Sequence, residues 1–195
     1  EGAIYEPLTR RIEAGEVRRA LGGGGGSAPG PSGLTKRVWK EVAEHHMGEI
    51  LTMYNRVLDT AEWDEGMADG LIYPIAKKAG LCTKGNARPI ALLETLTKGL
   101  TRILAGRWKH ILKAHPVIER SQMAFIPGAD IFDNIEVDSF LWEWARAEGE
   151  SLHVAYLDCS KAYDSVPQWL TKAALASHKV PEGVATLILK MDDVT

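Results

Sequence analysis

The sequence has 195 residues, 45% of them hydrophobic and 25% charged, which is typical of a globular protein with enough apolar residues for one core or two small lobes. It has no run of about 18 apolar residues and no leader-like N-terminus, so membrane spanning and secretion are unsupported, and its two distant cysteines, Cys82 and Cys159, exclude a disulfide framework or a zinc site and favour an intracellular compartment, cytoplasmic or nuclear. The formal net charge of -3 argues against a uniformly basic nucleic-acid-binding protein, so any such function depends on how the charges are distributed.

Residues 1–34 are predicted to form an N-terminal extension. The stretch from Glu1 to Leu21 places apolar residues at helical spacing and predicts a short amphipathic helix. Five consecutive glycines, Gly22 to Gly26, end it, because their backbone entropy makes helix or strand costly. Ser27 to Gly33 continues the irregular path with two prolines and two glycines, which favours a structured turn.

Residues 35–150 are predicted to be mostly helical with one β-hairpin. A long helix capped by Thr35 is expected to run to about Thr60. Its expected core-facing positions, spaced by three and four, are Val38, Trp39, Val42, His46, Ile50, Tyr54 and Leu58. After Gly70, two apolar runs flank a basic loop and predict a short hairpin, in which Pro74 and Pro89 place both strands at an edge.

Positive charge is concentrated between Leu71 and Lys113, where nine cations and one anion give a net charge of +8 and leave -11 for the rest of the chain. Within this segment an apolar stripe from Leu93 to Ile111 predicts a second helix. The other face of that helix carries Lys98, Arg102 and Lys109. Such a face could follow the backbone of a nucleic-acid template or could simply be solvated, and the residues alone do not separate the two.

A third helix is expected from about Asp130 to Glu148, before a final region of residues 151–195. In that region the apolar run from His153 to Leu157 predicts a buried strand that stops at Asp158. Pro167 is expected to open a helix at its first turn, and Pro181 another. The expected fold class is α+β. Because the chain starts with Glu and ends in a helical pattern without a stop signal, both ends are expected to be cuts.

Asp158 is the most informative candidate for chemistry, because a carboxylate at the C-terminal end of a strand lies where α/β sheets place ligands. Phosphoryl transfer by two Mg²⁺ ions needs carboxylates to hold the metals, and Asp158 can supply one such ligand. Alternatively, Asp158 and Ser160 cap the next helix, and spacing alone favours that simpler interpretation.

The segment from Tyr156 to Pro167 resembles the first palm motif of non-LTR retrotransposon (LINE-type) reverse transcriptases, a pattern of Leu-Asp-x-Ser-Lys-Ala-aromatic-Asp-x-Val. The resemblance implies that Asp158 is a catalytic, metal-binding aspartate and that the backbone carbonyl of Cys159 also reaches a metal. It further implies that Tyr163 is the steric gate, whose ring excludes ribonucleotides by overlap with the 2′-hydroxyl.

Other segments resemble motifs of the same family in the same order. Ala28 to Gly33 is similar to a Lys-Ala-Pro-Gly-Pro-Asp-Gly signature, but Ser27 and Ser32 stand where Lys and Asp are usual. These departures weaken any phosphate contact or turn-locking hydrogen bond expected there. The hairpin resembles the fingers hairpin of the family, which implies that Lys77 and Arg88 hold the incoming triphosphate. For Lys77 and its neighbour Lys78 the alternative is an exposed edge strand protected by lysines.

Two further segments complete the comparison with the family motifs. Gln122 to Ile135 resembles the next motif, but Ala129 replaces an arginine, so a template or primer contact is expected to be lost there. Asp192 and Asp193 look like the paired aspartates that supply the remaining metal ligands. We reject that interpretation, because no Gly-Gln motif lies between Val166 and Lys190 and the local pattern is helical.

The resemblance implies a right-hand polymerase fold, with residues 35–150 as the fingers region and 151–195 as the truncated start of the palm. It implies RNA-templated DNA synthesis with Mg²⁺, deoxynucleoside triphosphates, an RNA template and a DNA primer. Without the paired aspartates the 195-residue chain is expected to be inactive by itself. The alternative is a non-catalytic, nucleic-acid-binding remnant of a decayed element.

Overall fold

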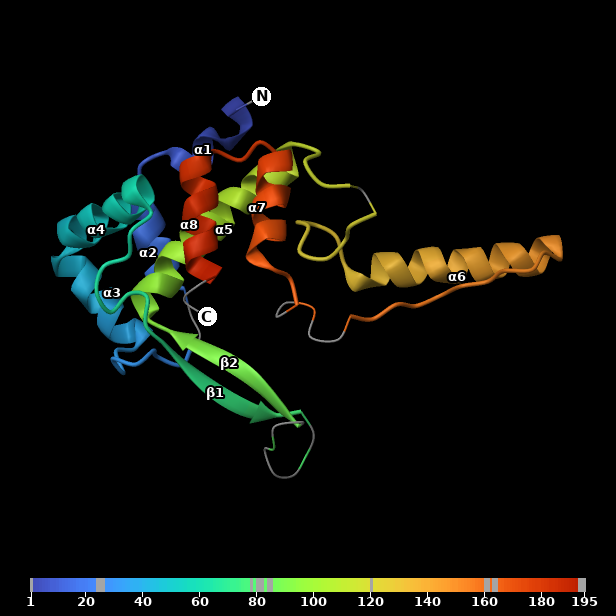
Figure 1. Ribbon diagram of the computed structural model, residues 1–195, viewed down its shortest axis with the longest axis horizontal. Coiled ribbons are helices and arrows are strands. Elements are labelled where there is room, and N and C mark those ends of the chain that lie inside the picture. The colour runs from blue at the N-terminus through green and yellow to red at the C-terminus, as the bar shows by residue number, and fades with distance from the viewer. Residues whose placement is uncertain are drawn as a thin grey trace.

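A helical body built around α5 carries two projections, a β-hairpin and an isolated helix (Figure 1). The computed structural model describes residues 2–23, 27–77, 79, 83, 86–119, 121–159, 162 and 165–192. The described residues form a mostly helical α+β arrangement with one antiparallel hairpin, as predicted. The elements in chain order are the 3-10 helix η1 (Gly2–Tyr5), α1 (Glu6–Thr9), α2 (Ala14–Gly22), α3 (Lys36–His45), α4 (Met47–Thr60), β1 (Gly70–Ala76), β2 (Ala87–Leu93), α5 (Thr95–Ala114), α6 (Ile131–Glu148), α7 (Gln168–Ser177) and α8 (Glu182–Asp192).

The main core lies where α2, α4 and α5 meet, and α8 reaches it from a distant part of the sequence. Tyr54, Val57, Leu100 and Leu187 are fully buried there. Leu100 belongs to the apolar stripe of α5, which packs as the sequence predicts. A smaller cluster joins α1 and α8 to the C-terminal end of α5 and contains Tyr5, Leu8, Ile111, Val180 and Val184.

The prediction of one continuous helix from Glu1 to Leu21 is wrong, because the chain leaves helical geometry between α1 and α2. Ile12 lies in this break, and its backbone bonds to a buried side chain: its N–H donates to Asn55 Oδ1 at 2.7 Å, and its carbonyl accepts from Asn55 Nδ2 at 3.2 Å. These bonds replace intrahelical ones, and a capping box of Glu13 and Glu16 then starts α2.

The helix predicted from Thr35 to Thr60 is also divided, at His46, into α3 and α4. The backbone of His46 leaves helical geometry, with φ -125° and ψ 33°, and its side chain is exposed beside Glu49. The prediction that His46 and Val38 face the core is therefore wrong, since both residues are exposed. Thr35 is at the N-cap of α3 as predicted, although its side chain makes no capping bond. The change of direction lets α3 pack on α2 while α4 contacts α8.

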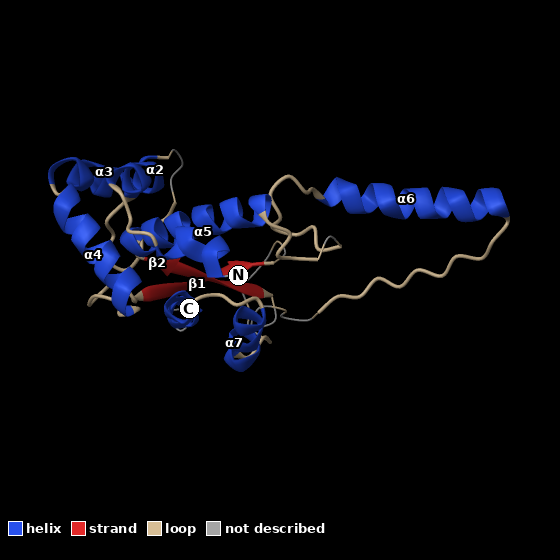
Figure 2. Cartoon of the chain, turned by 90° about the horizontal axis from the view of Figure 1, so that it is seen from above, coloured by secondary structure: helices blue, strands red, loops and turns tan. Residues whose placement is uncertain are grey.

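The hairpin forms where it is predicted, and its register sets its two prolines opposite each other. The Lys77 N–H donates to the Asn86 carbonyl at 2.7 Å, which makes these two residues a hydrogen-bonded pair. Because such pairs alternate along an antiparallel ladder, Pro74 and Pro89 fall at a non-hydrogen-bonded position. Neither missing N–H therefore costs a ladder bond, and both strands are edges, as predicted (Figure 2).

Helix α6 projects away from the body, and the chain returns along it in an extended path (Figures 1 and 2). Its start is the predicted one, with Asp130 at the N-cap and Asp133 completing a capping box. Apolar side chains are exposed on this helix, and they include Ile131, Phe132, Phe140, Trp142 and Trp144. The helix therefore buries little apolar surface against the rest of the chain.

The buried strand predicted from His153 to Leu157 does not form. The segment is extended, but its residues are exposed, and Leu157 retains 94% of its accessible surface. A strand needs a partner to satisfy its backbone groups, and β1 and β2 are the only strands that pair among the described residues. The Tyr156 hydroxyl instead donates to Asp138 of α6 at 2.6 Å, which ties the segment to that helix.

The two last helices begin close to their predicted starts. Pro167 is the N-cap of α7 and not a first-turn residue, and α8 begins at Glu182, so Pro181 likewise precedes the first turn. Helix α8 continues through Asp192, which confirms the expected helical pattern there; Asp193 lies outside the described residues. In the part of the chain that the structure describes, no helix is both long enough and apolar enough to cross a membrane.

Candidate nucleotide and nucleic-acid site

The hairpin register places the two predicted triphosphate ligands, Lys77 and Arg88, on one face. Arg88 lies directly opposite Ile75, and directly opposed residues of an antiparallel pair project to the same side. Lys77 lies just past the end of β1, two residues beyond Ile75. Its N–H bond to the Asn86 carbonyl continues the ladder, so period-two alternation puts Lys77 on that side as well. Diagonal neighbours of this kind are about 7–8 Å apart. Both residues are exposed, and neither forms an ion pair with a carboxylate of the described residues.

Asp158 and Cys159 are exposed at the end of the extended segment that follows α6. Asp158 does not cap the next helix, because α7 starts ten residues later with Pro167 at its N-cap. The simpler interpretation of Asp158 is therefore wrong. No group of three or more His, Cys, Asp or Glu side chains suited to a metal gathers among the described residues. Asp158 thus belongs to no such group among the described residues.

Tyr163, the predicted steric gate, lies outside the described residues, as do Lys78 and Ser160. The role assigned to Tyr163 therefore stays a prediction from the family motif.

The predicted basic face of α5 is occupied in part by the N-terminal extension. Lys98 Nζ donates to the Ala28 carbonyl, and Arg102 Nη1 donates to the Ala20 carbonyl. Burial lowers the pKa of the Lys98 ammonium; the Glu94 carboxylate opposes this shift and the charge of Arg102 adds to it. Lys109 is exposed. Lys98 therefore holds the loop that follows α2 and Arg102 holds the last turn of α2, while both keep further N–H groups for a ligand.

Residues 75–193 match the protein family described as "Reverse transcriptase (RNA-dependent DNA polymerase)", and this match covers more than half of the chain. The chain belongs to this reverse transcriptase family.

Curated relatives agree with this assignment. The chain is 27% identical over 155 residues to "Retrovirus-related Pol polyprotein from type-1 retrotransposable element R2" of Nasonia vitripennis, a match that covers 80% of this chain and 14% of that protein. The protein of the same name from Popillia japonica is 27% identical over 192 residues, which is 94% of this chain and 24% of that protein. The "Transposon TX1 uncharacterized 149 kDa protein" of Xenopus laevis is 37% identical over 92 residues, or 47% of this chain and 7% of that protein.

This reverse transcriptase chain thus spans 14% of one R2 relative and 24% of the other. The retrotransposon assignment made from the motifs, to the non-LTR type, is confirmed by these matches.

In this reverse transcriptase chain, the turn at Ala28 to Gly33 is docked on the junction between β2 and α5. The Ser32 N–H donates to Glu94 Oε1 at 2.6 Å, and the Ser32 hydroxyl donates to Glu94 Oε2 at 2.7 Å. A Cβ at Gly30 would lie 2.7 Å from the backbone of Leu93 and Glu94, so only glycine fits there. The backbone turn is retained with serine at position 32, whose hydroxyl donates to Glu94 and accepts from the Leu34 N–H at 3.1 Å.

Sequence reasoning missed Glu94 and Arg107 of the reverse transcriptase chain. Glu94 is the single anion in the basic segment, and that isolation is a signal that it has a specific partner. Arg107 was counted with the basic segment, yet it is buried and paired with Glu16. Its position on the apolar stripe, four residues before Ile111, is the signal for its burial.

Proposed function

We propose that this chain forms the fingers and the beginning of the palm of an RNA-directed DNA polymerase with a right-hand fold. In this proposal residues 1–34 are the N-terminal extension, 35–150 the fingers region and 151–195 the start of the palm. The observation that supports it most is the shared face of Lys77 and Arg88 on the hairpin, in a chain whose residues 75–193 match the reverse transcriptase family. Two exposed cations on one face suit a triphosphate, which arginine grips with two donors and lysine with one charge.

The proposed reaction is DNA synthesis from deoxynucleoside triphosphates, primed by DNA and templated by RNA. Asp158 would hold Mg²⁺ through its carboxylate, and Cys159 through its carbonyl; both are oxygen donors of the kind that Mg²⁺ prefers, and both residues are exposed. Of two bound metal ions, one would activate the 3′-hydroxyl and the other would neutralise the leaving pyrophosphate. Because the described residues gather no group of three or more metal-binding side chains, Asp158 supplies part of a metal site only.

Two other roles complete the proposal. Tyr163 excludes ribonucleotides by occupying the volume of the 2′-hydroxyl. Lys98, Arg102 and Lys109, on one face of α5, bind the backbone of the template or primer. Lys98 and Arg102 support this role because each donates to a backbone carbonyl and pairs with no carboxylate of the described residues, so the charge of each remains available.

Primer extension tests the proposed reaction. The assay uses an oligo(dT) primer on a poly(rA) template with dTTP and Mg²⁺, and compares the 195-residue chain with a chimera that continues into the segment of the Popillia japonica relative beyond its matched residues. We expect no extension by the chain alone and extension by the chimera. Asp158→Asn in the chimera should lower the rate by at least about a hundredfold, because loss of one metal ligand disables the group as a whole.

Three outcomes would count against this proposal. Extension by the 195-residue chain alone would show that Asp158 needs no further carboxylates from outside the chain. A chimera that extends primers equally well with Asn at position 158 would remove Asp158 from the metal site. Salt-dependent RNA binding by a chimera that never incorporates dTTP would favour a non-catalytic binding remnant.

A further inference from the structure

The hairpin joins α5 through a single residue. Strand β2 ends at Leu93 and α5 begins at Thr95, so Glu94 alone links the strand to the helix. Rotation about the backbone of Glu94 would therefore swing the whole hairpin relative to α5. Because an isolated two-stranded hairpin is only marginally stable, contacts at its base have to fix the direction in which it projects from the body (Figure 1).

The turn at Ala28 to Gly33, which we call the docked turn, supplies such contacts at Glu94. Gly30 lies against the backbone on both sides of the peptide bond that precedes Glu94, since a Cβ there would lie 2.7 Å from atoms of Leu93 and of Glu94. Ser32 holds both oxygens of the Glu94 carboxylate with its N–H and its hydroxyl. The docked turn therefore grips the linking residue by its backbone and by its side chain.

The Glu94 carboxylate is used for this contact and not to cap its own helix. Glu94 is the N-cap of α5, a position from which a carboxylate commonly accepts a bond from the first turn, yet no side-chain capping bond forms. Its side chain is buried, so its charge needs hydrogen-bond donors, and Ser32 provides them. The Glu94 side chain thus ties the base of the hairpin to the docked turn.

The docked turn is itself fixed to α5 at both ends. Lys98 donates to the Ala28 carbonyl at the start of the turn. The Thr95 hydroxyl donates to the Leu34 carbonyl, just after the turn, at 2.9 Å. Lys98 and Thr95 both belong to the first turns of α5, so the docked turn and the helix form one rigid support for the hairpin.

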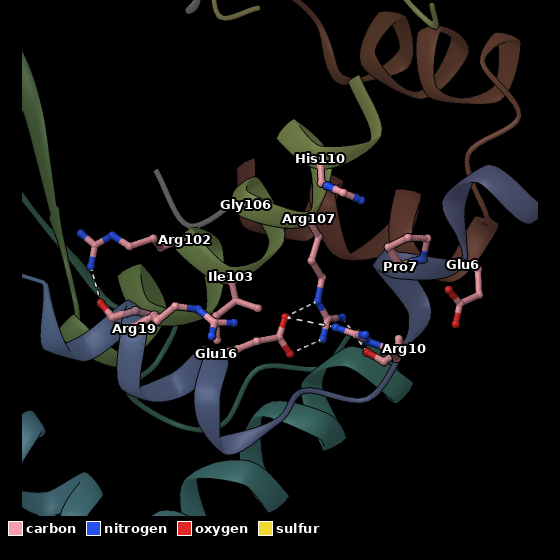
Figure 3. Close-up of a pocket in the computed structure, with 11 residues that line it drawn as sticks. Glu6, Pro7, Arg10, Glu16, Arg19, Arg102, Ile103, Gly106, Arg107 and His110 are labelled. Atoms are coloured by element: carbon pink, nitrogen blue, oxygen red, sulfur yellow. Dashed lines mark hydrogen bonds and ion pairs between the residues drawn. The ribbon is translucent and has the colours of Figure 1, made fainter. Parts of the chain in front are cut away.

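Helix α2, which precedes the docked turn in the chain, is also held on α5. Arg107 bonds both oxygens of Glu16, at 2.8 Å from Nε and 2.7 Å from Nη2, and Arg102 donates to the Ala20 carbonyl (Figure 3). These bonds lie beside a pocket of about 470 Å³ between the two helices. The N-terminal extension is therefore anchored on α5 both in α2 and at the docked turn.

The other strand of the hairpin is held less directly. The Thr97 hydroxyl donates to the carbonyl of Met67, which is buried in the main core. Ala68 and Asp69 lie between that anchor and the start of β1 at Gly70. The contact at Glu94 is therefore the one that acts directly on the end of a strand.

The length of the hairpin amplifies any change at its base. Arg88 lies six residues before Glu94, about 20 Å away along an extended strand. A swing of about 10° at Glu94 would move Arg88 by about 3.5 Å over that length. Charge-assisted hydrogen bonds are about 2.7–2.9 Å long, so a displacement of this size breaks them. The direction of the hairpin thus decides whether Lys77 and Arg88 reach a triphosphate.

We propose that the docked turn fixes the direction of the hairpin, and that Ser32 is thereby a positioning residue for the incoming deoxynucleoside triphosphate. Ser32 acts through Glu94 and does not touch the nucleotide. The inference rests on the proposed function in one respect, the assignment of Lys77 and Arg88 to the triphosphate.

The first experiment measures the direction of the hairpin in the 195-residue chain without any nucleotide. Spin labels are attached to Tyr73→Cys, at an exposed position of β1, and to Lys109→Cys, at an exposed position of α5, after both native cysteines, Cys82 and Cys159, are replaced by serine. Pulsed electron paramagnetic resonance then gives the distribution of distances between the two labels. Melting curves check that each variant is folded at the temperature at which it is labelled.

We expect one narrow distance distribution in the labelled parent and in the matched control Ser27→Ala, an exposed serine just before the turn contacts. Ser32→Ala should broaden the distribution at least about twofold, because a swing of about 10° already moves β1 by several ångströms. Ser32→Thr keeps the hydroxyl and should stay narrow. Gly30→Ala forces its Cβ against the linking backbone and should shift the mean distance.

The second experiment measures dTTP kinetics in the primer-extending chimera. Ser32→Ala should raise KM for dTTP about three- to tenfold and leave kcat unchanged, because only the fraction of molecules with a correctly directed hairpin binds dTTP tightly. Ser27→Ala should leave KM within about twofold of the unsubstituted chimera. In a chimera that already carries Lys77→Ala and Arg88→Ala, adding Ser32→Ala should raise KM no further, because the positioned side chains are gone.

Three results would overturn the inference. Unchanged distance distributions in both Ser32→Ala and Gly30→Ala would show that the docked turn does not direct the hairpin. A broadened distribution with an unchanged KM would remove Ser32 from nucleotide positioning. An increase in KM of the same size with and without Lys77 and Arg88 would place the effect of Ser32 elsewhere.

Failure of the proposed function gives a different pattern. A chimera that extends no primer, or whose KM for dTTP does not respond to Lys77→Ala and Arg88→Ala, overturns the proposed reaction or its triphosphate site. The distances in the 195-residue chain still decide, without nucleotide, whether the docked turn directs the hairpin.

Discussion

Arg107 and Glu16 form a buried ion pair with two parallel hydrogen bonds that joins α5 to α2 across 91 positions of sequence. The Arg107 guanidinium also donates to the carbonyls of Arg10 and Arg11, in the break between α1 and α2. One side chain therefore fixes both the helix α2 and the irregular segment before it. The N-terminal extension is held to the body by this contact as well as by apolar packing.

Removing the arginine should be strongly destabilising. Arg107→Met leaves the Glu16 carboxylate buried without its partner, and we expect the free energy of unfolding to fall by about 3–5 kcal/mol. Urea denaturation followed by circular dichroism measures this change. Arg11→Met, which removes an exposed pair with Asp59 at 3.8 Å, should cost less than about 1 kcal/mol. Similar losses in the two variants would contradict the structural role of Arg107.

The same pair predicts how stability depends on pH. The hydrogen bonds from Arg107 hold the pKa of Glu16 below its ordinary value of 4.5, against the opposing effect of burial. A carboxyl whose pKa is depressed in the folded state stabilises the fold above its unfolded pKa and loses that contribution as the pH falls through the folded pKa. Between about pH 6 and pH 3, stability should therefore fall more steeply in the wild type than in Glu16→Gln.

The control for this pH series is Glu44→Gln, at an exposed position of α3 with no ion pair among the described residues. Its stability should follow the wild-type curve. A Glu16→Gln curve parallel to the wild type would show that Glu16 is not a source of the acid sensitivity.

Alanine in place of either of two glycines of α5 should change the stability of the chain, but in opposite directions at the two positions. A Cβ at Gly99 would overlap the hydroxyl of Tyr54, which is fully buried and donates to the Leu96 carbonyl at 2.7 Å. Gly99→Ala should therefore lower stability by about 1–3 kcal/mol through overpacking. A Cβ at Gly106 meets nothing within 4 Å, so Gly106→Ala should raise stability by about 0.5–1 kcal/mol through helix propensity. Thermal melting of the two variants tests the pair, and stabilisation by Gly99→Ala would contradict the close packing described here.

The contact between Ser32 and Glu94 predicts that the residue usual in the family at position 32 destabilises this chain. Restoring the family's usual residue, Ser32→Asp, places a second carboxylate against Glu94 and should destabilise the chain by about 1–2 kcal/mol. Adding Glu94→Gln removes the repulsion and should recover part of the loss, which a double-mutant cycle measures. Ser27→Asp, at an exposed position on the same segment, should stay within about 0.5 kcal/mol of the wild type. An unchanged stability in Ser32→Asp would mean that the contact with Glu94 does not hold the turn.

The shared face of Lys77 and Arg88 on the hairpin predicts that substitutions there change the KM for dTTP in the primer-extending chimera. Arg88→Ala should raise KM for dTTP about tenfold, because a charge-assisted contact to the triphosphate is lost. Lys77→Ala should act in the same direction. Lys40→Ala, at an exposed position of α3, is the matched control and should leave KM unchanged. A KM that is insensitive to both hairpin substitutions would favour the alternative in which Lys77 only protects an edge strand.

Elements whose pattern is local were predictable from the sequence alone. The hairpin follows from two apolar runs around a basic loop, and its proline pair sits where edge strands tolerate proline. The apolar stripe of α5 and the start of α6 at Asp130 follow from helical spacing and capping preference. The family itself followed from motif order, and the shared face of Lys77 and Arg88 follows from period-two alternation once the register is known.

Features that depend on distant residues were decided by the tertiary structure. The break at Ile12 exists because Asn55, 43 positions away, satisfies its backbone, and no local pattern encodes that partner. The segment from His153 to Leu157 has the composition of a strand but stays unpaired, since strand formation needs a neighbour that local sequence cannot supply. Whether an arginine such as Arg107 is a surface cation or a buried anchor likewise depends on whether a carboxylate packs against it, which only the folded chain determines.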